Sequence, residues 1–132
     1  MLEEHHRWAA AEIQSYRFTF WEYNGGWSGP QAPVRVTVSE GKLVAARYLH
    51  YAFRPGRDLG FDITEREIAD IAGRSTISEL FDLMQKDLQQ AGLALGCTFH
   101  PELGFPMKYE RSYSQVFDAG YGFSISDFEV LE

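Results

Sequence analysis

The residues best suited to acid–base chemistry lie in the segment CTFHPE, near the end of a strand-like alternation. His100 is a candidate general base, because imidazole titrates near neutral pH, and Glu102 lies two positions further on. The single cysteine, Cys97, alternates with Leu95 and Phe99, which predicts a core-facing and inert thiol. Its three-residue separation from His100 places the two side chains on opposite faces of a strand. A Cys–His nucleophilic pair is therefore not expected.

No segment has the spacing of a metal or cofactor site. His5 and His6 are adjacent, so on a helix their side chains point about 100° apart and do not readily share one ion. The motifs HExxH and CxxC are absent, and the acidic residues between Asp58 and Asp70 lack the alternation of a calcium loop. The glycines form neither of the phosphate-binding patterns GxGxxG and GxxxxGK. We therefore predict no metal and no cofactor.

Three aromatic residues, Trp21, Tyr23 and Trp27, are the strongest candidates for ligand contact. They lie in WEYNGGWSGP, whose glycines and proline are typical of a loop. Because Trp and Tyr are favoured anchors at recognition surfaces, this segment predicts a binding surface. The alternative interpretation is that Trp21 and Tyr23 cover the second face of a sheet and that Trp27 closes the core.

The hydrophobic periodicity predicts the elements that position these residues. A short helix is expected over residues 3–14, and an alternation of aromatic residues predicts a strand over 15–23. Residues 33–38 and 42–51 are expected to form a hairpin around Glu40 and Gly41, because glycine adopts positive φ at little cost. Further strands are expected over 93–99, 107–113 and 121–130.

The principal helix is the best-defined element. Thr76 and Glu79 have the spacing of a capping box at its start, and Gly92 is suited to end it. Thr64 and Glu67 repeat that spacing before a short helical turn. Apolar residues three and four apart predict one buried stripe on the principal helix: Ile77, Leu80, Phe81, Met84, Leu88 and Ala91.

Together these elements predict an α+β fold. It consists of an antiparallel sheet of four to six strands, one principal amphipathic helix packed on one face, and a short N-terminal helix. Residues 1–132 have the length of a single domain. Aromatic residues make up 15% of the chain, which supports a high strand content because such side chains favour pleated, half-buried surfaces.

Charge and hydropathy argue against two classes of partner. The net charge is −7 and the basic residues are thinly spread, whereas a nucleic-acid-binding surface needs a basic stripe. No apolar run approaches the roughly 20 residues of a spanning helix, so membrane insertion is not expected. The N-terminus, MLEEHHRW, lacks the features of a signal peptide, so a cytoplasmic location is expected for the chain as written. The alternative is export, if the sequence has lost its signal.

A set of motifs extends along nearly the whole chain. It consists of an N-terminal helix with a Trp, S-Y-x-F-x-F, V-x-V-x-x-G-x-[LV], T-I-x-x-L-F, P-E-x-G-[FY]-P and D-x-G-Y. The pattern resembles that of a bacterial domain family of unknown function, found mostly in small secreted proteins and lipoproteins. The matching residues are Trp8, Ser15, Tyr16, Phe18, Val34, Val36, Gly41, Thr76, Ile77, Leu80, Phe81, Gly104, Phe105, Pro106 and Asp118. The resemblance implies the fold and supplies no activity.

We therefore predict a non-enzymatic binding module that presents an aromatic surface to a protein, a peptide or a small ligand. One alternative is an enzyme that uses His100 with a nearby carboxylate, either Glu102 or Asp118. Another is an assembly domain that forms a homodimer through an edge strand or through an uncovered face of the sheet.

Overall fold

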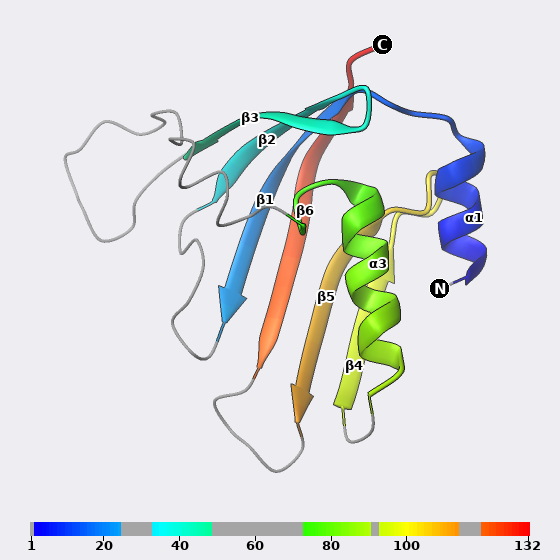
Figure 1. Cartoon of the computed structure of the whole chain (residues 1–132), viewed down its shortest axis with the longest axis vertical. Helices are drawn as coiled ribbons and strands as arrows, with labels where there is room; N and C mark the ends of the chain where they lie inside the picture. The colour runs from blue at the N-terminus through cyan, green and yellow to red at the C-terminus, as the bar shows by residue number, and fades with distance from the viewer. Residues whose placement is uncertain (1, 25–32, 49–72, 91–92, 114–119) are drawn as a thin grey trace, which may run out of the picture.

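The computed structural model describes residues 2–24, 33–48, 73–90, 93–113 and 120–132 (Figure 1). The elements in these ranges are α1 (Leu2–Ala10), β1 (Tyr16–Asn24), β2 (Val34–Ser39), β3 (Lys42–Tyr48), α3 (Ile77–Leu88), β4 (Leu93–Phe99), β5 (Pro106–Tyr113) and β6 (Tyr121–Val130). The strands form one antiparallel sheet in the order β3-β2-β1-β6-β5-β4. The α+β prediction is confirmed at this level, with a six-stranded sheet.

The first and last strands of the chain pair at the centre of the sheet. β1 and β6 are antiparallel, with Tyr16 opposite Val130 at one end and Asn24 opposite Tyr121 at the other. Figure 1 shows them side by side, β1 in blue and β6 in orange-red. This pairing joins an N-terminal group of strands, β1 to β3, to a C-terminal group, β4 to β6.

The alternation of side chains decides which face of the sheet is buried. Phe18 and Phe20 on β1 have no exposed surface, and Val36 on β2 is equally buried. Tyr109 on β5 and Phe123 on β6 extend the same core across the sheet. We call the face that carries these five residues the inner face, and its opposite the outer face.

The hairpin predicted at Glu40 and Gly41 is confirmed. Both residues have positive φ, 52° and 76°, and they join β2 to β3. The Gly41 N–H donates a hydrogen bond of 2.9 Å to the Gln14 carbonyl oxygen, which ties the turn to the segment that precedes β1.

The capping box predicted at the start of α3 is present. The Thr76 hydroxyl accepts a hydrogen bond from the Glu79 N–H at 3.2 Å, and the Glu79 carboxylate accepts one from the Thr76 N–H at 3.0 Å. The next amide, that of Ile77, donates to the phenolic oxygen of Tyr16 at 2.9 Å. Because a helix start leaves its first amides without internal partners, β1 helps to satisfy the beginning of α3.

The two helices contact each other and the sheet through aromatic rings. Figure 1 shows α3 running along β5 and β4, with α1 beside it. His5 of α1 stacks on Phe81 of α3 at a centroid distance of 4.4 Å. Phe81 in turn stacks on Phe99 of β4 at 6.3 Å, and Trp8 meets Tyr16 edge to face at 5.4 Å. The short N-terminal helix is therefore packed into the fold, although it ends at Ala10 and not at residue 14 as predicted.

The apolar stripe predicted for α3 is wrong at its last described turn. Leu88 is 58% exposed, and Asp87 is buried in its place. Tyr109 and Arg111 on β5 explain the exchange, because each donates a 2.5 Å hydrogen bond to the Asp87 carboxylate. The earlier members of the stripe are buried: Ile77, Leu80, Phe81 and Met84.

Several predicted features lie outside the described residues. They are the capping box at Thr64 and Glu67, the end of the strand predicted to reach residue 51, and the residues Ala91 and Gly92. The prediction that Gly92 ends the principal helix is wrong, because α3 ends at Leu88 with Gln89 as its C-cap.

Gly104→Ala is expected to destabilise the fold. Gly104 has φ +81°, and a Cβ at this position would collide with the backbone oxygen of Glu4 in α1. We expect the free energy of unfolding, measured by urea denaturation, to fall by more than about 2 kcal/mol. Gly96→Ala is the matched control, since nothing lies within 4 Å of a Cβ there, and it is expected to change stability by less than about 0.5 kcal/mol. Equal effects would contradict the docking of α1 against this turn.

Candidate functional site

Two of the three predicted ligand-contacting aromatic residues form a pair on the outer face. Trp21 and Tyr23 are strand residues of β1, which continues to Asn24, in agreement with the strand predicted over 15–23. Their rings lie 5.1 Å apart at an interplanar angle of 37°. Trp21 is 40% exposed and Tyr23 is half-buried. Trp27 lies outside the described residues.

The position of Tyr23 is fixed by its neighbours on β5 and β6. Tyr23 is opposite Gly122, where a Cβ would collide with the tyrosine ring, so the ring lies against bare backbone. Burial raises the pKa of the Tyr23 hydroxyl, and a hydrogen bond with the Glu110 carboxylate raises it further. A hollow of about 390 Å³ opens beside the ring, with Glu110 and Ser112 among its lining residues.

The outer face also carries an ionic cluster. Arg17 and Arg35 each contact a different carboxylate oxygen of Glu129 at 2.9 Å. Arg35 also donates to the backbone oxygen of Asp127 at 2.7 Å and to the Thr19 hydroxyl at 3.1 Å. The hydrogen bond from Arg17 lowers the pKa of Glu129. The two guanidinium groups thus share the Glu129 carboxylate, and the outer face divides into this ionic part and the aromatic part around Trp21.

His100, the predicted acid–base residue, caps the turn between β4 and β5. Its Nδ1 accepts hydrogen bonds from the N–H groups of Glu102 and Leu103, at 3.2 and 3.0 Å. Its ring stacks on Phe105 at 4.8 Å. With Nδ1 accepting, the neutral ring carries its proton on Nε2. Within the described ranges no hydrogen bond or ion pair joins the Glu102 carboxylate to this ring, and Asp118 lies outside those ranges, so the enzyme alternative stays a prediction.

A buried polar network crosses the inner face and was missed by the sequence analysis. Glu22 accepts a hydrogen bond from Tyr121 at 2.6 Å and forms an ion pair with Arg74, also at 2.6 Å. The Arg111 guanidinium lies 4.8 Å from the centroid of the Tyr121 ring and reaches Asp87 at 2.5 Å. A signal for Glu22 was present, because it shares the parity of the core residues of β1. The basic partner of Glu22 is Arg74, which is far from it in the sequence.

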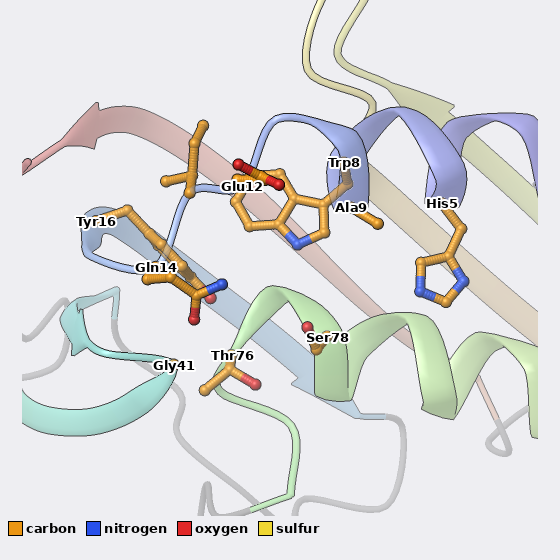
Figure 2. A pocket seen from close by; sticks show the side chains of 10 residues that line it. His5, Trp8, Ala9, Glu12, Gln14, Tyr16, Gly41, Thr76 and Ser78 are labelled. Atoms are coloured by element: carbon orange, nitrogen blue, oxygen red, sulfur yellow. The ribbon is translucent and has the colours of Figure 1, made fainter.

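A second hollow, of about 230 Å³, lies where α1, the start of β1, the β2–β3 turn and the start of α3 meet. Figure 2 shows the side chains that line it, and the indole nitrogen of Trp8 points from α1 toward Thr76 and Ser78 of the α3 start. Tyr16 lines the hollow as well, and burial raises the pKa of its hydroxyl to about 12, so it stays protonated. We call this cavity the α1–α3 hollow.

The described residues contain no group of three or more His, Cys, Asp and Glu side chains placed to hold a metal ion. Among the same residues, no helix is long and apolar enough to cross a membrane.

Comparison with known proteins gives a family and no activity. The chain matches DUF6174, a family of unknown function, over residues 1–130. It belongs to this family. Searches of the curated proteins and of the solved structures found no match. Membership in DUF6174 agrees with the resemblance to a family of unknown function, and it leaves the function to be inferred from the molecule itself.

The inward position of Asp87 in this DUF6174 chain predicts an unusual ranking of two neighbouring substitutions. Asp87→Ala is expected to lower the free energy of unfolding by about 3–5 kcal/mol, because it leaves the guanidinium of Arg111 without its carboxylate. Leu88→Ala is the control and is expected to cost less than about 0.5 kcal/mol, since Leu88 is exposed. Urea denaturation measures the free energy of unfolding of both variants. A larger loss in Leu88→Ala than in Asp87→Ala would support the apolar stripe predicted from sequence.

The environment of Cys97 predicts an unreactive thiol. The side chain is half-buried, and burial raises its pKa from 9.0 to about 12. Because the thiolate is the reacting form, alkylation by iodoacetamide at about pH 8 is expected to be at least about a hundredfold slower in the native protein than in the urea-unfolded chain. Mass spectrometry over time measures both rates. Similar rates in the two states would show that the thiol is accessible and ionises normally.

Proposed function

We propose that this member of DUF6174 is a non-enzymatic binding module that recognises a protein or peptide partner through the outer face of its sheet. The observation that carries the proposal is the pair of Trp21 and Tyr23, in which Trp21 keeps 40% of its surface exposed on a central strand. Trp and Tyr dominate the energetics of protein interfaces, because they bury large area and also hydrogen-bond at one end.

The pair is well prepared for binding because Tyr23 is already held in place. Its ring lies against the backbone at Gly122, and its hydroxyl lies near the Glu110 carboxylate. Trp21 rests on that ring. An aromatic anchor that is ordered before binding loses little conformational entropy when a partner arrives, so more of the contact free energy contributes to affinity.

The surroundings of the pair indicate the chemistry of the partner. Trp21 is opposite Ser124 on β6, so a small hydroxyl lies next to the large ring. The nearby cations Arg17 and Arg35 are already paired with Glu129. This arrangement favours an apolar or aromatic side chain with uncharged hydrogen-bonding groups around it, over a strongly charged ligand.

We also propose that α3 packs on the inner face with its buried side. Ile77 contacts Tyr16 of β1, and Asp87 contacts Tyr109 of β5. Both strand residues belong to the inner face, which leaves the outer face available to a partner.

The proposal is tested by selecting binding peptides from a random phage-displayed library on the immobilised chain. Enriched peptides are then titrated against the wild type and Trp21→Ser by fluorescence polarisation. We expect Trp21→Ser to weaken binding by at least about thirtyfold, as for an interface hot spot. The melting temperature of the Trp21→Ser variant is expected to differ little from that of the wild type, because the Trp21 ring is on the surface.

Val44→Ser is the matched control, since Val44 is exposed on the edge strand β3, two strands away from β1. It should leave peptide binding unchanged. Peptides that bind Trp21→Ser as tightly as the wild type would remove the outer-face proposal. A sizing experiment on the same samples separates the assembly alternative, because a dimer abolished by Trp21→Ser would identify a second copy as the partner.

A further inference from the structure

The α1–α3 hollow collects hydrogen-bond donors that have no acceptor. Trp8 is 5% exposed, and its only polar atom is a donor, the indole N–H. In the part of the chain that the structure describes, no hydrogen bond from this group is formed, and Figure 2 shows it directed toward the start of α3. The indole nitrogen is not one of the fully buried polar atoms that lack a partner, so it is accessible from the hollow and free to donate to an acceptor there.

Two buried hydroxyl groups add to this donor set. The Tyr16 hydroxyl accepts a hydrogen bond from the Ile77 N–H, and the Thr76 hydroxyl accepts one from the Glu79 N–H. A hydroxyl that accepts still has one proton to donate. Neither proton has an acceptor among the described residues. Because both side chains line the hollow and use their oxygens to hold α3, their protons are available to a ligand.

The first turn of α3 contributes a further donor. Its amides are satisfied by Tyr16 at Ile77, by the Thr76 hydroxyl at Glu79 and by the Thr76 carbonyl at Leu80. The Ser78 N–H has no acceptor within the described ranges, and Ser78 lines the hollow. The N-terminus of a 12-residue helix also carries partial positive charge, part of which the Glu79 carboxylate of the capping box already offsets.

One lining residue opposes an anion and must be considered. The Glu12 carboxylate belongs to the hollow, together with the neutral side chain of Gln14. In Figure 2 the Glu12 carboxylate is drawn across the Trp8 indole, on the side of its nitrogen that is away from Thr76. The donors of Tyr16, Thr76 and Ser78 lie at the start of α3, whereas Trp8 and the carboxylate belong to the α1 side.

We propose that the α1–α3 hollow binds a carboxylate group, supplied by a small organic acid or by the C-terminus of a short peptide. A carboxylate has two oxygens with about four acceptor positions, which matches the donors of Trp8, Tyr16, Thr76 and Ser78. The volume of about 230 Å³ suits a small molecule and is too little for a folded partner. This site is separate from the outer face and does not depend on the proposed function.

The test is an NMR titration of the ¹⁵N-labelled chain with sodium acetate. The indole peak of Trp8 is assigned by its loss in Trp8→Phe. We expect it to move downfield in a saturable manner, with a dissociation constant in the millimolar range, because acetate is small. The Trp21 indole peak, assigned by its loss in Trp21→Phe, should not shift when acetate is added. Acetamide has nearly the same shape without the charge and should give no saturable shift.

Two variants make the assignment specific. Tyr16→Phe removes one donor and keeps the ring, and it is expected to weaken acetate binding about tenfold. Tyr23→Phe is its control, because that hydroxyl is on the outer face, and it should bind acetate as the wild type does. Ser78→Pro removes the unpartnered N–H of Ser78, at a first-turn position of α3 where proline is tolerated, and should weaken binding about threefold, so a Tyr16→Phe that fails to fold leaves the test intact.

The source of the carboxylate is decided by comparing acetate with dialanine and with its amidated form. Tighter binding of dialanine than of acetate, with loss on amidation, assigns a peptide C-terminus; tighter binding of acetate assigns a small acid. An unmoved Trp8 peak, an equal response to acetamide, or unchanged affinity in both Tyr16→Phe and Ser78→Pro would each overturn the proposal and leave the hollow to water.

Discussion

The pairing of β1 with β6 is the constraint on which the rest of the structure depends. The two strands come from opposite ends of the chain and lie at the centre of the sheet. Each half of the sheet is built from strands that are neighbours in sequence, which lowers the entropic cost of pairing them. Joining the two halves brings together strands from opposite ends of the chain. The entropic cost of this long-range contact is offset only when the side chains of both halves are packed.

β1 also holds the start of α3 at two points on the inner face. Near one end Tyr16 accepts the Ile77 amide, and near the other Glu22 pairs with Arg74 in the approach to the helix. The C-terminal end of α3 is fixed by Asp87, which accepts a hydrogen bond from Tyr109 and forms an ion pair with Arg111 of β5. The helix is thus placed by polar contacts at both ends and by apolar side chains between them. Polar contacts add orientation, because hydrogen bonds need geometry that apolar packing does not require.

This placement has consequences for both candidate binding regions. The Tyr16 hydroxyl accepts a hydrogen bond from the Ile77 N–H and lines the α1–α3 hollow. The same contact therefore stabilises the start of α3 and places the hydroxyl proton of Tyr16 at the hollow. On the opposite side, the alternation that buries Glu22 necessarily turns Trp21 and Tyr23 outward. The aromatic pair and the buried network are therefore two results of a single strand register.

His100 illustrates how the fold gives a structural role to a residue whose type is suited to catalysis. In the sequence the imidazole of His100 is close to the carboxylate of Glu102, a pair of groups that could support acid–base chemistry. In the folded chain Nδ1 accepts two backbone amides and the ring stacks on Phe105, so its described contacts are those of a turn cap. Residue type is visible in the sequence, whereas the hydrogen-bond partners that decide its role are set by the backbone around it.

The sequence by itself determined the features that depend on neighbouring residues. The capping box at Thr76, the turn at Gly41 and the limits of β4 and β6 follow from local φ preferences and alternation, and all four are found as predicted. Only the tertiary structure decided that Asp87 faces inward in place of Leu88, and that Trp8 and Tyr16 share a hollow with α3. The physical reason is that periodicity records average hydrophobicity along a face. Burying a charge depends on a particular partner, here Arg111, which only long-range folding brings to it.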